Sequence, residues 1–127
     1  MIIGIGTDIV EIDRIVGVLS RRGESFARRI LSPAEREQFL SKKDQARFLA
    51  KRFAAKEAAS KALGTGFRQG VSWQDFEITN DELGRPLLAL SGQAQLLLQG
   101  KGASVSHLSI SDEKHYAIAF VVFSAPP

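Results

Sequence analysis

The chain has 127 residues, of which 44% are hydrophobic and 24% charged, and it contains no cysteine. This length predicts a single domain over residues 1–127, with a core that needs neither disulfides nor a structural zinc. The lack of cysteine excludes thiol nucleophiles, CxxC redox motifs, iron–sulfur clusters and thiolate zinc sites. No run approaches the roughly 20 apolar residues of a membrane span. The start lacks the basic segment of a signal peptide, so we expect a cytoplasmic protein that does not engage a membrane.

The net charge of +3 is distributed unevenly along the chain. Residues 1–70 contain 14 basic and 8 acidic residues, whereas residues 71–127 contain 3 and 6. A positive first half indicates an anionic partner, such as a phosphorylated small molecule, a nucleic acid or an acidic protein. The alternative is that these residues only form the solvated faces of helices.

The first half of the chain predicts one strand followed by helices. The β-branched run at 2–10 predicts a buried strand. Apolar residues at helical spacing predict a helix from Asp13 that stops near Gly23. Ser32-Pro33-Ala34-Glu35 predicts the start of another, because it combines a serine N-cap, an early proline and a glutamate three residues later.

The longest helix is expected over residues 45–63, which contain no glycine or proline and lead into Gly64 as a left-handed C-cap. Beyond it, turn residues separate short apolar or alternating runs. These predict strands over 72–79, 86–91, 104–111 and 115–124, and a helix over 93–99. The order βαααββαββ predicts an α+β fold in which helices pack on a mainly antiparallel sheet.

Two carboxylates stand out as candidates for chemistry. Asp8 comes where the first strand is expected to end, a common place for a functional carboxylate, although a turn or cap role is the alternative. Glu57 lies in the long helix near Arg52, Lys56 and Lys61, and the alternative for it is an ordinary surface pair with Lys61. Two carboxylates without cysteine favour a hard cation such as Mg²⁺, held largely by water and phosphates.

The long helix also carries a stripe of small residues that predicts a close approach to a sheet. The stripe consists of Ala50, Ala54, Ala58 and Ala62. Gly64-Thr65-Gly66 follows this helix, where it either terminates the helix or lets the backbone approach a phosphate. His107 alternates with Leu108 and is expected to face away from the apolar side of its strand, as a surface or interface residue.

Four segments together resemble the bacterial holo-[acyl-carrier-protein] synthases, over essentially the whole chain and in the order typical of that family. They are GIGTDIVEI at 4–12, RFAAKEAASKALGTG at 52–66, GRP at 84–86 and HLSISDEKHYA at 107–117. The resemblance implies a Mg²⁺-dependent 4′-phosphopantetheinyl transferase of fatty acid biosynthesis. Such an enzyme moves phosphopantetheine from coenzyme A to a serine of apo acyl carrier protein and releases adenosine 3′,5′-bisphosphate.

The resemblance also implies roles for individual residues. Asp8 and Glu57 correspond to the metal-binding carboxylates, and Lys61 would neutralise charge on the leaving phosphate. Contacts to the nucleotide and its phosphates fall on Arg52, Lys56, Gly64, Thr65, Gly66 and His107. A metal-bound water or a nearby carboxylate would take the serine proton.

The family resemblance extends to macromolecular partners. It implies that exposed arginines of the first helices dock the acidic carrier protein, and the matching residues are Arg14, Arg21, Arg22 and Arg28. It further implies a homotrimer with nucleotide sites between subunits. Asp112 stands where many relatives carry a second histidine, which resembles the enterobacterial-type branch.

A small nucleic-acid-binding module is the competing interpretation of the basic first half. That function requires aromatic residues interleaved with cations for base stacking. Phe48 and Phe53 fall instead at helical spacings that suit core packing, so we expect no nucleic-acid partner.

Overall fold

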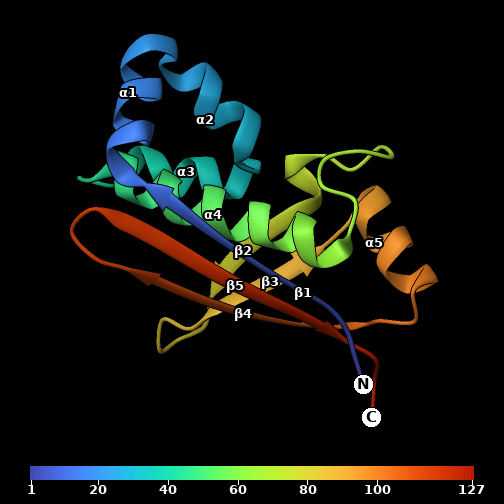
Figure 1. The fold of residues 1–127 in the computed structure, drawn as a ribbon. Helices are drawn as coiled ribbons and strands as arrows, with labels where there is room; N and C mark the ends of the chain where they lie inside the picture. The colour runs from blue at the N-terminus through green and yellow to red at the C-terminus, as the bar shows by residue number, and fades with distance from the viewer.

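The structure, a computed structural model, describes residues 1–127 and follows the predicted order of strands and helices, with one short helix added (Figure 1). In chain order the elements are β1 (Ile2–Glu11), α1 (Ile12–Arg22), α2 (Glu24–Ile30), α3 (Pro33–Ser41), α4 (Gln45–Leu63), the 3₁₀ turn η1 (Trp73–Asp75), β2 (Phe76–Asn80), β3 (Pro86–Leu90), α5 (Gly92–Gly100), β4 (Val105–Asp112) and β5 (Tyr116–Ser124). No helix combines the length and the apolar character needed to cross a bilayer.

The added helix α2 follows α1 after a single residue. Gly23, with φ of 59°, both ends α1 and begins α2. Because the sequence presents this glycine as a stop and leaves only eight residues before the next capping motif at Ser32, local pattern alone did not predict α2. Its Ala27 and Ile30 are buried, so the helix depends on tertiary packing.

The predicted start of α3 and the predicted end of α4 are both confirmed. Ser32 accepts a hydrogen bond from the Glu35 N–H, and the Glu35 carboxylate accepts one from the Ser32 N–H, which completes a capping box. Gly64 adopts φ of 88° at the end of α4, the left-handed conformation that glycine tolerates best.

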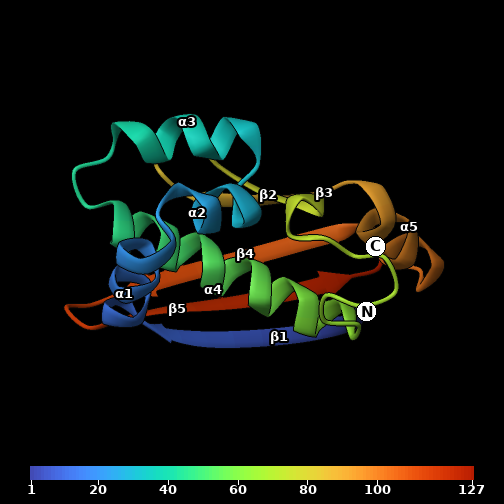
Figure 2. The same ribbon diagram turned by 90° about the horizontal axis from the view of Figure 1, so that it is seen from above.

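The strands form two antiparallel sheets. One has the order β1-β5-β4 and the other pairs β2 with β3. The Ser106 hydroxyl on β4 donates to the Leu88 carbonyl on β3 at 2.7 Å and joins their neighbouring edges. Figure 2 shows α4 lying along the three-stranded sheet, with α2 and α3 on the side of α4 away from β1.

The contact between α4 and β1 depends on small residues from both elements. A side-chain carbon at Gly6 would overlap the carbonyl oxygen of Ala58, and one at Gly4 would overlap that of Ala62. Ala54, Ala58 and Ala62 are buried. The predicted close approach is therefore confirmed, and its partner is the first strand.

The opposite face of the three-stranded sheet carries exposed apolar side chains. Ile5, Ile9, Ile118 and Phe120 are 60%, 59%, 40% and 45% exposed. No element of the chain covers this outer face. The two termini lie together at one end of the sheet, where the Ala125 N–H donates to the Met1 carbonyl at 2.8 Å (Figure 1).

Candidate active site

The β1–α4 contact brings Asp8 and Lys61 together. Asp8 lies on the same side of β1 as Gly4 and Gly6, which is the side that faces α4. The Lys61 ammonium lies 2.9 Å from Asp8 Oδ1 and 3.1 Å from the carbonyl oxygen of Thr7. The expectation that the strand ends at Asp8 is wrong: β1 continues to Glu11, and Asp8 is paired with Ala119 of β5.

Glu57 lies one helical turn before Lys61 and close enough to Asp8 for their charges to interact. Burial raises the pKa of Glu57, the Asp8 carboxylate raises it further, and Lys61 lowers it. No Glu57–Lys61 salt bridge forms, because the Lys61 ammonium is turned to Asp8. Asp8 and Glu57, hereafter the carboxylate pair, are therefore two like charges in a partly desolvated site.

The carboxylate pair fits a hard divalent cation. Carboxylate oxygens are the ligands that Mg²⁺ prefers, and a cation would relieve the repulsion that raises the pKa of Glu57. No group of three or more histidine, aspartate or glutamate side chains converges anywhere in the chain. An ion held by the pair would thus take its other ligands from water or a bound phosphate, which is the usual coordination of Mg²⁺ in phosphate chemistry.

A polar recess of about 290 Å³ begins at Lys61, next to the carboxylate pair. We call it the glycine recess, and its lining consists of Lys61, Gly64, Thr65, Gly66 and Arg68. Both glycines have positive φ, and the Thr65 hydroxyl donates to the Gly66 carbonyl at 2.8 Å. Two cations beside exposed backbone suit an anion such as a phosphate.

Lys56 does not lie where the resemblance placed it. Its side chain is 0% exposed, and its ammonium donates to Glu35 Oε1 at 2.6 Å and to the Ile30 carbonyl at 2.8 Å. Burial lowers the pKa of Lys56, while Glu35 opposes that shift. The prediction that Lys56 contacts a nucleotide is corrected, because the buried Glu35 carboxylate has drawn this ammonium into the interior.

Arg52 is also mostly buried, and burial lowers its pKa while Glu35 raises it. Its Nε lies 3.5 Å from Glu35 Oε2 but makes no hydrogen bond. The side chain reaches the wall of a separate recess of about 290 Å³, which includes Lys42, Lys51 and Pro86. Arg52 therefore retains access to a ligand, but at a place apart from the glycine recess.

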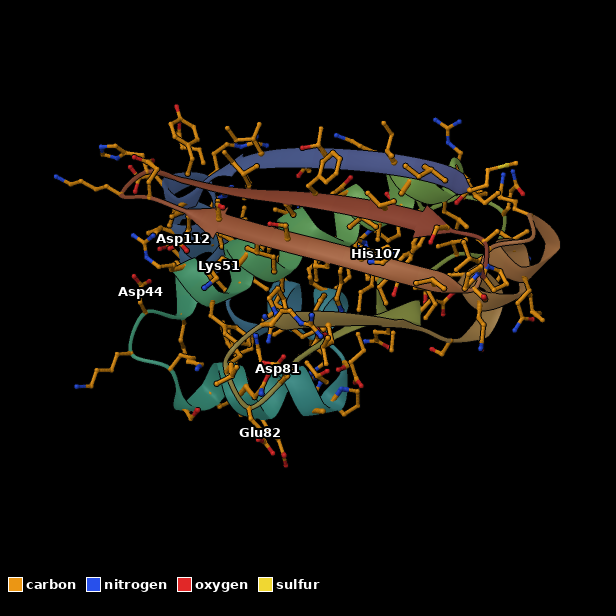
Figure 3. All side chains as sticks on the ribbon, turned by 90° about the horizontal axis from the view of Figure 1, so that it is seen from below. Asp44, Lys51, Asp81, Glu82, His107 and Asp112 are labelled. Carbon is orange, nitrogen blue, oxygen red and sulfur yellow. The ribbon has the colours of Figure 1, made fainter.

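His107 lies in a third location. Figure 3 shows it on β4, and its alternation with half-buried Leu108 and Ile110 is confirmed. It faces the exposed side of the sheet, and its Nε2 lies 3.4 Å from the Ser124 hydroxyl. His107 also lines a recess of about 210 Å³ with Arg85 and Pro86. We call this the hairpin recess, and it brings the GRP and HLSIS segments together.

The predicted site residues thus do not form one cluster within one chain, and Arg52 and Lys56 lie apart from the rest. Asp8, Glu57, Lys61 and the glycines lie at the β1–α4 contact, whereas His107 and the GRP segment lie along β3 and β4. Because His107 faces the side of the sheet opposite to Asp8, a single chain does not bring it to the carboxylate pair.

The four predicted docking arginines are all exposed. Arg14, Arg21 and Arg22 lie on α1, and Arg28 lies on α2. None forms a salt bridge within the chain, in contrast to Arg47, which binds Asp112 at 2.9 Å. Since α1 begins four residues after Asp8, the basic surface follows the carboxylate pair closely along the chain.

Sequence reasoning missed some participants. Arg68 lines the glycine recess, and its place just after Gly66 could have indicated that. Glu35 was explained entirely as a capping residue, so no local signal pointed to its ion pair with Lys56. Asp112 is held by Arg47 and lies 3.7 Å from Lys51. Figure 3 shows Asp112 and Lys51 near each other.

The aromatic residues near the basic segments pack against one another. Phe48 lies 6.3 Å from Phe39, and Phe53 lies 5.1 Å from Trp73, measured between ring centroids. This is the core-packing role expected from their spacing.

Comparison with known proteins agrees with this geometry. Residues 4–121 match the family described as the 4′-phosphopantetheinyl transferase superfamily. A holo-[acyl-carrier-protein] synthase of Vibrio cholerae is 62% identical over 122 residues, which cover 96% of this chain and 97% of the relative. The corresponding protein of Vibrio parahaemolyticus is 60% identical over 98% of each chain.

Solved structures give the same result. The holo-[acyl-carrier-protein] synthase of Neisseria meningitidis superposes with a TM-score of 0.90 at 46% identity, covering 98% of this chain and 99% of the other. That of Bacillus anthracis, in complex with CoA (3′,5′-ADP), gives 0.84 at 41% identity over 99% of each. With both carboxylates, the glycine segment and the fold in place, the chain belongs to the holo-[acyl-carrier-protein] synthase family of the 4′-phosphopantetheinyl transferase superfamily.

Proposed function

We propose that this enzyme transfers 4′-phosphopantetheine from coenzyme A to a serine of apo acyl carrier protein, in the cytoplasm and in support of fatty acid biosynthesis. The serine oxygen bonds to the phosphorus that carries pantetheine and loses its proton. The bond from that phosphorus to the bridging oxygen breaks, and adenosine 3′,5′-bisphosphate leaves. The observation that carries the proposal is the position of Asp8, Glu57 and Lys61 beside the glycine recess.

Each residue of this group has a role that its surroundings support. Asp8 and Glu57 hold Mg²⁺, which when bound neutralises diphosphate charge and orients the reacting phosphorus. Lys61 is about half exposed and can turn from Asp8 to a bound phosphate. Arg68 and the backbone around Gly64 and Gly66 accommodate further phosphate charge in the glycine recess. Together these groups supply the positioning and electrostatic stabilisation on which phosphoryl transfer mostly depends.

The direct test incubates the protein with apo carrier protein, coenzyme A and Mg²⁺ and weighs the carrier by mass spectrometry. We expect a gain of one phosphopantetheinyl group and an equal amount of adenosine 3′,5′-bisphosphate. A carrier whose acceptor serine is alanine serves as the control. A wild-type carrier that gains no mass would refute the proposed activity.

Glu57→Gln tests the metal role. Because a bound metal ion contributes several kcal/mol to catalysis, kcat should fall by about 100-fold or more in the same assay. In the absence of metal, Glu57→Gln should also melt at a higher temperature than the parent at neutral pH. A folded-state pKa above the unfolded value means that ionised Glu57 destabilises the fold, and this penalty is fully present above the folded pKa.

The pH dependence of the melting temperature provides a second check on Glu57→Gln. In the parent, the penalty fades as pH falls through the folded pKa of Glu57, so the two melting temperatures should converge toward acid pH. Glu37→Gln, on an exposed part of α3, is the matched control and should change neither activity nor melting. Full Mg²⁺-dependent turnover by Glu57→Gln would remove Glu57 from the metal site.

The basic surface of α1 and α2 docks the acidic carrier protein in this proposal, and its exposed, unpaired arginines support that role. Arg14→Glu and Arg21→Glu should each raise the KM for carrier protein on the order of tenfold, because they place like charges across the interface. The KM for coenzyme A should hardly change. Lys43→Glu, in the α3–α4 connection, is the control and should change neither KM. If Arg14→Glu and Arg21→Glu raised the KM for carrier protein and the KM for coenzyme A equally, the docking role would be contradicted.

Three chains assemble into a homotrimer in this proposal, with nucleotide sites between subunits. The separation of the hairpin recess from the carboxylate pair supports it, because a neighbouring subunit could complete the site. The uncovered apolar face of the sheet provides a surface for assembly. Light scattering should give the mass of three chains. Phe120→Glu on that face should yield smaller, inactive species, whereas Leu96→Glu on α5 should not; an active monomer would contradict assembly.

A further inference from the structure

A buried charge cluster lies on the side of α4 opposite to β1, outside the proposed catalytic groups. Its centre is Glu35, whose side chain is 1% exposed. Glu35 Oε1 accepts from the Lys56 ammonium at 2.6 Å and the Ser32 N–H at 2.9 Å. Glu35 Oε2 accepts from the Ile78 N–H at 2.9 Å. With Arg52 Nε at 3.5 Å, every side of this carboxylate faces a positive or hydrogen-bonding group.

The same cluster ties together four elements of the fold. Glu35 and Ser32 belong to the start of α3, Ile78 to β2, and Lys56 to the middle of α4. Lys56 also donates to the carbonyl of Ile30, the last residue of α2. The only strong contacts of the Lys56 ammonium are therefore to α2 and α3.

Lys56 and Glu57 are consecutive residues on α4, so their side chains point about 100° apart around the helix. Lys56 is held toward α2 and α3, and that orientation directs Glu57 toward β1 and Asp8. On its other side, α4 rests on Gly4 and Gly6, which fix its distance from the strand. The two glycines thus set the distance between α4 and β1, whereas Lys56 sets the rotation of α4 about its own axis.

Stability alone does not account for a buried ion pair here. Well-packed apolar residues of similar size commonly replace such a pair with no loss of stability, because both charges must be desolvated. What an apolar replacement lacks is a directional bond. An ammonium with two fixed acceptors holds the helix in one rotational setting, whereas apolar side chains tolerate several.

We infer that Glu35 is a positioning residue for the metal site: through Lys56 it sets the rotation of α4 that places the Glu57 carboxylate beside Asp8. This inference rests on the proposed metal role of Glu57. Glu35 itself lies in the interior and touches neither metal nor substrate. Its effect should therefore appear in metal affinity, separately from its effect on folding.

The test measures Mn²⁺ binding by electron paramagnetic resonance, with coenzyme A present and carrier protein absent. The main variant is Glu35→Gln/Lys56→Met, which removes both charges of the Glu35–Lys56 pair. It also removes the carboxylate that faces Arg52, so its melting temperature must be measured alongside its affinity. We expect its dissociation constant for Mn²⁺ to rise at least about tenfold, an effect comparable to losing a group that orients a metal ligand, because the rotation that directs Glu57 toward Asp8 would no longer be fixed. Melting is recorded for every variant, and binding is measured well below each transition.

The control is Leu98→Ala on α5, which destabilises the protein through a cavity in a different part of the core. It should bind Mn²⁺ like the parent despite a lower melting temperature. If Glu35→Gln/Lys56→Met binds Mn²⁺ within twofold of the parent, or if the affinities of all variants simply follow melting temperature, the inference is overturned. Should the double variant not fold, Lys56→Met replaces it, because it removes the link to α4 while Glu35 keeps Arg52 as a cation. Unchanged Mn²⁺ affinity in that variant would overturn the inference as well.

Failure of the metal proposal would look different. If the parent takes up no Mn²⁺, or if Glu57→Gln binds it as well as the parent does, the metal role of Glu57 is wrong and the positioning role falls with it. If Glu57→Gln loses Mn²⁺ and Glu35→Gln/Lys56→Met retains it, the proposed function stands and only the positioning role is wrong.

Discussion

The contact between α4 and β1 is the constraint on which the rest of this structure depends. Because Gly4 and Gly6 lack side chains, the carbonyls of Ala58 and Ala62 can lie directly against the strand. At that separation the Asp8 carboxylate lies 2.9 Å from the Lys61 ammonium and shares a site with Glu57. The same residues that build the core therefore set the dimensions of the proposed catalytic centre.

The charged groups on the two faces of α4 differ in how fully they are paired. On the side of α2 and α3, the Glu35 carboxylate has a positive or hydrogen-bonding partner for each oxygen. On the side of β1, Asp8 and Glu57 oppose each other with one lysine between two acids. Satisfied groups are typical of a scaffold, and unsatisfied like charges are typical of a site that awaits a ligand. The helix thus separates a paired interior cluster from the face that carries the proposed metal site.

Local signals were sufficient for much of this fold. The capping box at Ser32, the left-handed Gly64 and the alanine stripe of α4 follow from residue chemistry within a few positions, and each is confirmed. The order of strands and helices followed from the same signals. Helix α2 escaped prediction because the eight residues between Gly23 and the capping motif at Ser32 are too few to show a helical pattern, and the packing of Ala27 and Ile30 decides their conformation.

The candidate site was predictable as a set of residues but not as an arrangement. Asp8 and Glu57 could be named from sequence, yet the burial of Lys56 depends on a carboxylate 21 positions away. His107 could be assigned to the exposed side of its strand by alternation. That this side lies across the sheet from Asp8 is a property of strand order, which neither residue encodes locally.

The meeting of the two chain ends has a practical consequence for anyone handling this protein. Met1 and Ala125 are joined by a backbone hydrogen bond, and residues from both ends line a recess that also contains His107. A purification tag or fluorescent fusion at either terminus would therefore emerge beside the uncovered sheet face and the histidine. A label intended to leave both undisturbed belongs at an exposed position such as Lys43 in the α3–α4 connection, which lines neither the recess at the termini nor the hairpin recess.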